Sequence, residues 1–299
     1  MNIHLENINL NSTSGPNHFA SKLIQYMGQQ GAQFDLGQRP DARLCFIETN
    51  VVHTQQIPLF QRLDGIYFNT EQPYELQNAN IKRTYLSADG VIFQSEFNKA
   101  LTTAYFGDHP NTTVIRNGAD TEHIATIKTL SSARLDQYEK VWCCASSWRP
   151  HKRLQENIRY FLEHSAEKDC LIIAGEKTEN IPRQKNIFYV GNLTIAELIS
   201  VYKRADYFLH LAWLDHCPNV VVDARAAGCQ IICSSAGGTQ EIAGPEAIVI
   251  EEDKWDFQPV PLYHPPPLDF SRKIKNKWEI GYNMDSVAIS YYNFLQKSI

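Results

Sequence analysis

Residues 149–153 carry three cations within five positions, directly after an apolar run at 141–144. A guanidinium such as that of Arg149 presents a planar fork of N–H donors, and the ammonium of Lys152 supplies a compact point charge. Together they would neutralise a diphosphate. The alternative is a solvated basic loop, but the position directly after an apolar run favours an anion-binding site.

Two aspartates, separated by seven residues, flank the start of a predicted helix. Asp215 precedes Pro218, and Asp223 lies about one turn inside a helix that we expect to run from about Pro218 to Ala227. Proline suits the first helical position because its missing N–H has no partner there, and Gly228 suits the helix end. Free N–H groups at the helix start would face an anion, and the carboxylates would accept sugar or ribose hydroxyls. Alternatively, both aspartates are ordinary charged residues of a solvated helix.

A pair of glycines follows the next apolar run of the second half. Gly237 and Gly238 precede Thr239, at the start of a predicted short helix. Since glycine has no Cβ, the backbone can approach a phosphate closely there. A glycine pair alone is weak evidence. After the two charged segments, it favours a site for a sugar phosphate.

Short apolar runs alternate with amphipathic stretches in both halves of the chain, as is typical of parallel strands buried on both faces. The predicted strands are 2–5, 44–48, 58–62, 90–94, 112–115, 141–144, 171–174, 187–190, 207–210, 230–233 and 247–250. The predicted helices are 17–28, 76–86, 96–106, 153–163, 195–204, 219–227 and 284–295. This alternation, twice over, predicts an α/β protein with two parallel-sheet lobes. Parallel sheets bind ligands at the carboxyl ends of their strands, so the default active site is a cleft between the lobes.

The change from one lobe to the next is expected between about Asn117 and Glu139, where a turn signal and a polar stretch precede a fresh apolar strand. We therefore predict an N-terminal lobe at 1–125, a C-terminal lobe at 126–283 and a closing helix at 284–299. The proline-rich segment 258–269 is expected to lack regular structure.

Composition narrows the classes of function. The 299 residues carry a formal net charge of −5, which argues against a nucleic-acid partner. No apolar run approaches the roughly 20 residues of a membrane-spanning helix, and the N-terminus has no signal-peptide pattern. The seven cysteines show no framework for disulfides or zinc. We therefore expect a cytoplasmic protein with reduced thiols and no transmembrane segment, while peripheral membrane contact stays open.

The three charged or glycine-rich segments, taken in order, resemble the donor lobe of family 4 glycosyltransferases, which are retaining enzymes of the GT-B fold. The similar residues are Ser147–Lys152, Tyr189–Gly191, the pair Asp215 and Asp223 with Pro218–Val221 between them, and Ala236–Glu241. Residues 91–95 and 114–120 are similar to the family's last N-lobe strand and the segment entering its interdomain linker. The resemblance covers about residues 89–250 and implies two Rossmann-like lobes with parallel sheets facing across a central cleft.

The resemblance assigns roles to the second lobe. Arg149 and Lys152 would hold the donor diphosphate, Asp215 the hydroxyls of the transferred sugar, and Asp223 the ribose. Of these four residues, Arg149, Lys152 and Asp215 are predicted to be catalytic. The remaining predicted donor contacts are Pro218, Asn219, Val220, Gly191, Asn192, Leu193, Gly237, Gly238, Thr239 and, in the first lobe, Gly15.

The sequence also departs from the family pattern. Family members usually carry glutamates where Asp215 and Asp223 stand, so each carboxylate here is one methylene shorter. Asp64 falls where many members carry a histidine near the sugar, and it is predicted on the acceptor side together with Ser95. The proline-rich segment replaces helical sequence expected near the end.

The resulting hypothesis is a retaining hexosyltransferase that uses a nucleoside diphosphate sugar and a hydroxyl of a glycan, a lipid-linked or a small-molecule acceptor. The sequence has no clean Asp-x-Asp motif, and its cations already serve the leaving group, so we expect neither a metal nor another cofactor. Two alternatives stay open: a nucleotide-sugar epimerase of the same fold, and a non-catalytic sugar-nucleotide or glycan-binding protein.

Overall fold

The computed structural model describes residues 1–12, 14–52, 56–176 and 184–297. The chain forms two compact units. The first comprises Met1–Gly118, Asp256–Val260 and Tyr282–Ile299, and the second comprises Ala119–Trp255 and Pro261–Gly281. Relative to the predicted boundary, residues 119–125 therefore lie in the second unit, and the closing helix packs into the first.

The first unit is built on a fully parallel sheet in the order β2-β1-β3-β4-β5-β6. Its strands are β1 (Asn2–Glu6), β2 (Gln33–Phe34), β3 (Ala42–Phe46), β4 (Leu59–Leu63), β5 (Gly90–Phe93) and β6 (Thr112–Val114). β3 ends two residues earlier than predicted, before Ile47, whose positive φ of 70° breaks the extended backbone. β2 is too short to give a sequence signal.

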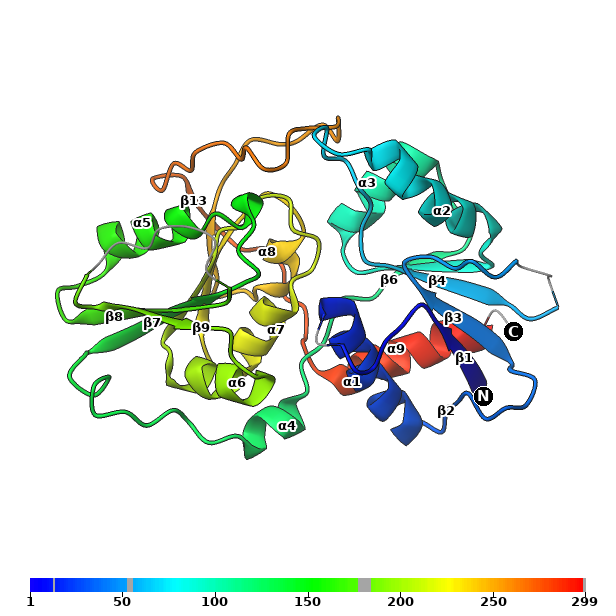
Figure 1. Cartoon of the computed structure of the whole chain (residues 1–299), viewed down its shortest axis with the longest axis horizontal. Helices are drawn as coiled ribbons and strands as arrows, with labels where there is room; N and C mark the ends of the chain where they lie inside the picture. Colours follow the sequence, from blue (N-terminus) through cyan, green and yellow to red (C-terminus); the bar gives the residue numbers. More distant parts are fainter. Residues whose placement is uncertain (13, 53–55, 177–183, 298–299) are drawn as a thin grey trace. The chain divides into compact units, whose positions relative to one another are not determined.

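Helices cover both faces of this sheet (Figure 1). They are α1 (Gly15–Gln29), α2 (Tyr74–Ser87), α3 (Glu96–Phe106) and α9 (Met284–Lys297). α1 and α9 pack on the same face because the apolar sides of both helices, including Phe19 and Tyr291, share one buried cluster with β1 and β3. The C-terminal helix therefore completes the core of the first unit.

The second unit contains a sheet in the order β13-β12-β11-β10-β7-β8-β9. Its strands are β7 (Lys140–Ala145), β8 (Asp169–Ala174), β9 (Ile187–Gly191), β10 (Tyr207–His210), β11 (Gln230–Ser234), β12 (Ile248–Ile250) and β13 (Lys273–Lys275). All neighbours are parallel except β12 and β13, which pair antiparallel. The parallel sheets are thus confirmed, with one antiparallel edge strand added.

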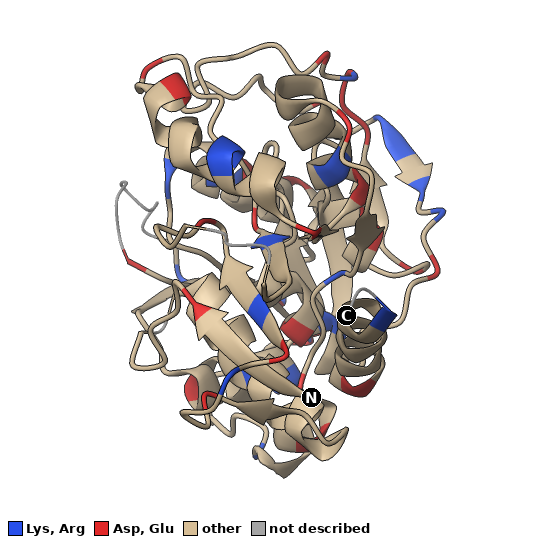
Figure 2. Cartoon of the chain, turned by 90° about the vertical axis from the view of Figure 1, so that its right-hand side faces the viewer, with Lys and Arg blue, Asp and Glu red and all other residues tan. Residues whose placement is uncertain are grey.

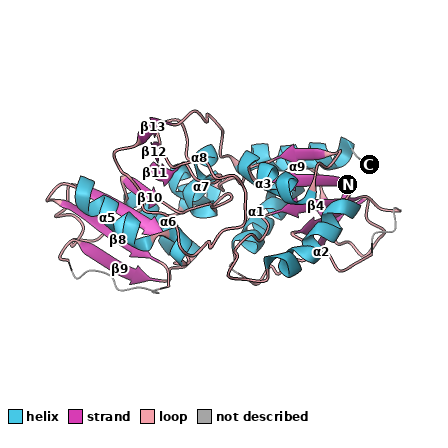
Figure 3. Ribbon diagram, turned by 90° about the horizontal axis from the view of Figure 1, so that it is seen from above, coloured by secondary structure: helices cyan, strands magenta, loops and turns pink. Residues whose placement is uncertain are grey.

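Six helices belong to the described part of the second unit. They are α4 (Thr121–Thr126), the 3₁₀ turn η1 (Pro150–Lys152), α5 (Leu154–His164), α6 (Ile195–Arg204), α7 (Asn219–Ala226) and α8 (Thr239–Ile242). α5 covers one face of the sheet, where it packs in a cluster with Trp142 and Leu171. α6 and α7 lie against the other face, where Tyr202 contacts Phe208 (Figures 1 and 3).

The order of strands reverses at the centre of this second sheet. β7 is followed along the chain by β8 on one side, whereas β10 lies on its other side. In open parallel sheets, the crevice at the carboxyl ends of such strands is the usual ligand site. The loops that follow β7 and β10 are therefore the first candidates for a ligand site.

Four further observations bear on the sequence-based expectations. The proline-rich segment 258–269 contains neither a helix nor a strand, apart from an isolated bridge between Asn69 and Val260. All seven cysteines are buried free thiols. Among the described helices, none has both the length and the hydropathy needed to cross a bilayer. Basic and acidic residues are interspersed along the chain (Figure 2).

Candidate functional site

The loop after β7 presents its cations unequally. Arg149 is exposed, and no hydrogen bond or ion pair is seen between its guanidinium and the described residues. Lys152 closes η1 and is mostly buried, with 18% of its side chain exposed. Arg153 is buried and has left-handed backbone angles (φ 53°, ψ 52°), which turn the chain from η1 directly into α5. The three cations that the sequence groups together therefore occupy three different environments.

The loop after β10 meets this loop at Asp215. The Lys152 ammonium donates to Asp215 Oδ2 at 2.5 Å, although the two residues lie 63 positions apart. The buried His210 Nε2 lies 2.8 Å from the same oxygen. A backbone bond from Trp213 N to the carbonyl of His151 (2.7 Å) joins the two loops. The predicted proximity of Lys152 and Asp215 is present in the structure.

The hydrogen bonds of Asp215 limit what its carboxylate can still accept. Oδ2 already receives Lys152 and His210, and Oδ1 receives the backbone N–H of His216 at 3.0 Å. Since a carboxylate has about four acceptor positions, only one is left for a ligand. Asp215 is therefore first of all the counter-ion of Lys152, and it cannot hold two vicinal hydroxyls without giving up a present bond.

The charges of the buried cluster lie on the Lys152–Asp215 ion pair. Burial alone would raise the pKa of Asp215, but Lys152 and His210 outweigh it and hold this pKa well below its usual range. Burial, reinforced by Lys152, lowers the pKa of His151 to about 3 and that of His216 to about 4. The neighbouring imidazoles are hence neutral near pH 7, and Lys152 carries the positive charge of the buried cluster.

Because His151 and His216 are neutral in the folded protein, we expect the free energy of unfolding to decrease in mild acid. In the unfolded chain, a histidine has a pKa of about 6.5. Between about pH 6.5 and 4, the unfolded state therefore binds more protons than the folded state. The free energy of unfolding falls as the pH falls, by up to about 1.4 kcal/mol per pH unit for each histidine. Asparagine substitutions of both His151 and His216 should flatten this dependence, whereas the exposed His123→Asn variant should not.

The measurement is urea unfolding followed by tryptophan fluorescence from pH 7 to 4. It reports on the second unit alone, because that unit contains all five tryptophans, namely Trp142, Trp148, Trp213, Trp255 and Trp278. An unfolding free energy that did not decrease across this range in the wild type would contradict neutral, buried imidazoles.

The glycine pair packs its backbone directly against Asp215. Gly237 forms an isolated parallel bridge with Asp215, and the N–H of Gly238 donates to the Asp215 carbonyl at 2.7 Å. Gly237 has φ 96°, and a Cβ there would lie 2.5 Å from the Asp215 carbonyl oxygen. The glycine is therefore required by close backbone contact with the carboxylate loop. Thr239 is fully buried at the start of α8 and presents no exposed surface.

We expect Gly237→Ala to displace the Asp215 loop and to destabilise the second unit by about 2 kcal/mol or more, through backbone strain and the steric clash. Gly228→Ala is the matched control, since Gly228 also has a positive φ, of 104°, but a Cβ there would meet no atom within 4 Å. Tryptophan-monitored unfolding compares the two variants. Equal destabilisation of the two variants would show that the close contact between Gly237 and Asp215 does not contribute to stability.

The helix after the Asp215 loop begins at Asn219, as in the predicted range 219–227, but Pro218 does not take the expected first helical position. α7 starts at Asn219, so Pro218 occupies the N-cap position with extended backbone angles (φ −70°, ψ 118°) rather than the first helical position. Its side chain provides no cap, because proline has no polar group. Asn219 and Val220, both half-buried, form the first turn. Asp223 lies one turn further on and is half-buried.

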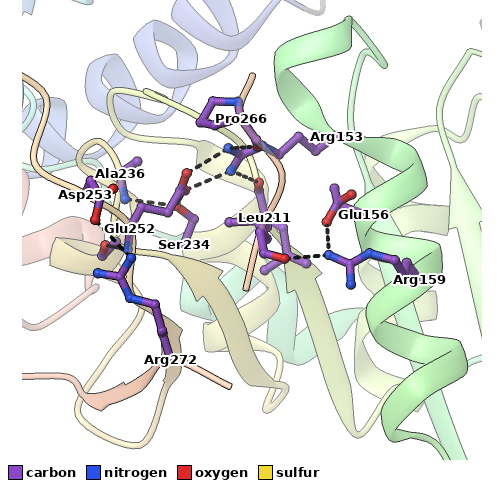
Figure 4. A network of polar contacts seen from close by, with 12 residues as sticks. Arg153, Glu156, Arg159, Leu211, Ser234, Ala236, Glu252, Asp253, Pro266 and Arg272 are labelled. Carbon is purple, nitrogen blue, oxygen red and sulfur yellow. Dashed lines mark hydrogen bonds and ion pairs between the residues drawn. The ribbon is translucent and has the colours of Figure 1, made fainter. Parts of the chain in front are cut away.

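A buried ion pair between Arg153 and Glu252 fixes the loop after β7 (Figure 4). Arg153 donates to both carboxylate oxygens of Glu252, at 2.8 and 2.7 Å, and to the carbonyl of Pro266 at 2.8 Å. Ser234 Oγ donates to the same carboxylate. The αL residue that follows Lys152 is thereby tied to the ends of β11 and β12 and to the proline-rich segment.

Asn157 of α5 ties the two loops to each other. Its amide donates to the carbonyls of Lys152 and Arg153, at 3.2 and 2.7 Å, and its oxygen accepts the N–H of Leu211 at 3.2 Å. Asn157 is completely buried. The backbone positions of both loops are thus fixed by a side chain that touches neither charge of the Lys152–Asp215 pair.

The predicted residues after β9 lie apart from this cluster. β8 separates β9 from β7 in the sheet. Gly191 turns the chain with φ 74°, Asn192 is exposed, and Leu193 is half-buried. Leu193 lines a largely apolar cavity of about 820 Å³ between β9, α6 and the segment 127–135. Sequence similarity alone connects these three residues with the site.

The three predicted residues of the first unit also differ in their surroundings. Gly15 is the first residue of α1, directly after the loop that follows β1. Asp64 follows β4 and is bound by Arg62 and Gln94, with 15% of its side chain exposed. Ser95 is fully buried, and its hydroxyl accepts the N–H of Asn98 to cap α3. Its predicted place on the acceptor side stays a prediction.

Sequence reasoning missed three polar residues that shape the site: His210, Asn157 and Glu252. A signal existed for His210, which is a polar residue ending an apolar strand at the carboxyl edge of the sheet. Asn157 and Glu252 are recognisable only from their contacts. In the part of the chain that the structure describes, no group of three or more His, Cys, Asp or Glu side chains could hold a metal ion.

Comparison with known proteins finds a family model that matches the segment containing this site. Residues 139–258 match the family described as glycosyl transferases group 1. The matched range contains both loops, the glycine pair and all the predicted residues except Gly15, Asp64 and Ser95. No curated protein sequence matches the chain.

Solved structures share the fold at low sequence identity. Sucrose-phosphate synthase from Thermosynechococcus elongatus is 11% identical with a TM-score of 0.66, covering 99% of this chain and 98% of that one. Anabaena HepE in complex with UDP-glucose is 14% identical with a TM-score of 0.60, covering 80% and 81%. AviGT4, a glycosyltransferase involved in avilamycin A biosynthesis, is 11% identical with a TM-score of 0.64, covering 99% and 97%. The chain thus has the GT-B fold, and its residues 139–258 are similar to the glycosyl transferases group 1.

Proposed function

We propose that this chain transfers a hexose from a nucleoside diphosphate sugar to an acceptor hydroxyl, with retention of configuration at the anomeric carbon. The observation that carries the proposal is the Lys152–Asp215 ion pair at the carboxyl ends of β7 and β10, inside the range that matches the family. The fold neighbour HepE, whose structure contains UDP-glucose, supports a uridine diphosphate sugar as the first donor to test.

In the proposed reaction, the bond between the anomeric carbon and the diphosphate oxygen breaks, and its electron pair stays on the diphosphate. Lys152 and the exposed Arg149 stabilise this new charge, aided by the N-terminus of α7 at Asn219. Stabilisation that is stronger in the transition state than in the ground state is what accelerates the reaction. The acceptor oxygen bonds to the anomeric carbon on the same face, and its proton passes to the departing phosphate oxygen.

The other contacts follow from this arrangement as parts of the proposal. Asp215 uses its single remaining acceptor position for one sugar hydroxyl, and Asp223 binds the ribose. The backbone at 218–220 and at Gly237 faces the sugar phosphate, and Gly191, Asn192 and Leu193 border the base. Asp64 serves the acceptor. Because the cations of the chain supply the charge, the proposed transfer needs no metal or other cofactor.

The test is release of nucleoside diphosphate from a panel of nucleotide sugars, with UDP-glucose first, in the presence and absence of sugar and sugar-phosphate acceptors. NMR of the product then gives the anomeric configuration. We expect acceptor-dependent release of UDP, a retained configuration and the same rate in EDTA. Conversion of the donor sugar without an acceptor would indicate an epimerase instead. Thermal stabilisation by donors without any turnover would indicate a binding protein.

A further inference from the structure

His210 is a buried polar residue for which the proposed transfer has so far no use. It ends β10, is 4% exposed, and stacks on Phe208 with ring centroids 6.3 Å apart. Its Nε2 lies 2.8 Å from Asp215 Oδ2, the oxygen that also receives the Lys152 ammonium. Two donors from two different segments therefore converge on one oxygen atom of Asp215.

A histidine at this place in the sheet has an energetic cost. The preceding residues of β10 are apolar or aromatic, and Phe208 and Leu209 are completely buried. Burying a polar group among such neighbours is unfavourable unless the group forms a hydrogen bond. The bond to Asp215 satisfies the Nε2 of the imidazole, and it occupies the acceptor position that Lys152 leaves open on Oδ2.

This geometry restricts how Asp215 can turn. With only Lys152 on Oδ2, the carboxylate could rotate about its bond to Cβ and follow the lysine, since side-chain torsions of this kind are broad. With His210 on Oδ2 and the His216 N–H on Oδ1, two donors from fixed positions define the carboxylate plane. Lys152 then keeps two of its three N–H groups for another anion.

We propose that His210 is a positioning residue of the transfer reaction, which rests on the proposed function. It holds the Asp215 carboxylate in place while Lys152 is shared between that carboxylate and the diphosphate leaving group. Without it, Lys152 and Asp215 move together toward the incoming anion, so the ammonium is misplaced when charge develops on the leaving oxygen. Small displacements of this kind have large effects on rate.

The proposal predicts different effects of losing His210 on KM and on kcat. Loss of His210 leaves the charges that attract the donor in place, so the KM for the donor should change by less than about threefold. The rate constant kcat should fall by about tenfold, as is common when the partner of a directly acting group is removed. A residue needed only for packing would lower stability without this split.

The variants are His210→Leu, which removes the donor group, and His210→Gln, whose amide nitrogen can take the place of Nε2. We expect His210→Leu to lose about tenfold in kcat and His210→Gln to recover most of it. The matched control is His164→Leu in the same unit, because His164 hydrogen-bonds the Tyr160 carbonyl and contacts the rings of Tyr160 and Phe270, none of which belongs to the site. It should leave kcat unchanged. Equal losses in His210→Leu and His210→Gln, or no loss in either, would overturn the proposal.

A second measurement keeps this inference distinct from the proposed function. In ¹⁵N NMR of histidine-labelled protein, His210 should show the tautomer protonated at Nε2, and Asp215→Asn should shift that resonance. If the wild type used no nucleotide sugar at all, the proposed function would fail while this signature remained. An Nε2 without a proton would refute the positioning contact, whatever the activity.

Discussion

Replacing Lys152 with alanine is expected to lower kcat/KM for the nucleotide sugar by a hundredfold or more. Removal of a single group that stabilises a developing oxyanion typically has an effect of this size. Lys152 is the cation of the buried cluster at the carboxyl ends of β7 and β10, and the histidines around it are held neutral by burial. No neighbouring imidazole can therefore replace its charge near pH 7.

The Lys152→Ala variant also removes the counter-ion of Asp215, so its stability must be measured together with its rate. Lys152→Ala combined with Asp215→Asn leaves no unpaired buried carboxylate and should restore stability but not turnover. Lys168→Ala is the control for loss of a lysine, because Lys168 is 69% exposed and pairs only with Glu139 at the surface. Unchanged turnover in a folded Lys152→Ala variant would show that the assigned role is wrong.

The strands of both units other than β2 and β13 could be predicted because most of them are apolar runs with a clear end. Tyr207–His210 is one example, predicted with both bounds as observed. The edge strand Lys273–Lys275 could not be predicted, because its residues are all exposed and alternate charge with one isoleucine. Its pairing with β12 depends on a neighbour that is distant in sequence. A buried strand is recognisable in the sequence as a run of apolar residues. An exposed strand at a sheet edge such as β13 has no such run.

The site was predictable to the extent that topology determines it. Lys152 and Asp215 each follow a strand, and parallel strands present their carboxyl ends at one edge. The individual bonds could not be predicted, because they depend on side-chain directions within loops. The sequence treats Arg149, Lys152 and Arg153 as one basic group. The structure gives Arg153 an internal partner, Glu252, 99 residues away.

Arg153 provides the second large effect, on stability. Its guanidinium and the Glu252 carboxylate are 2% and 7% exposed and form a bidentate pair. Removing one member of a buried pair leaves the other charge uncompensated, which destabilises a protein by about 3–5 kcal/mol. We expect Arg153→Met to destabilise the second unit by this amount in tryptophan-monitored unfolding. Combined with Glu252→Leu, it should recover more than half of the loss, because no buried charge remains.

The left-handed backbone of Arg153 adds a finer test of the same interaction. At φ 53°, any side chain with a Cβ is strained, and glycine is not. Arg153→Gly should therefore be more stable than Arg153→Met by about 1 kcal/mol, yet less stable than the wild type. This order would show that the chain accepts strain directly after Lys152 because the ion pair to Glu252 and the bond to Pro266 outweigh it. If Arg153→Gly matched or exceeded the wild type, the buried pair and the bond to Pro266 would not outweigh the backbone strain, and the position of the Lys152 loop would have to depend on Asn157 instead.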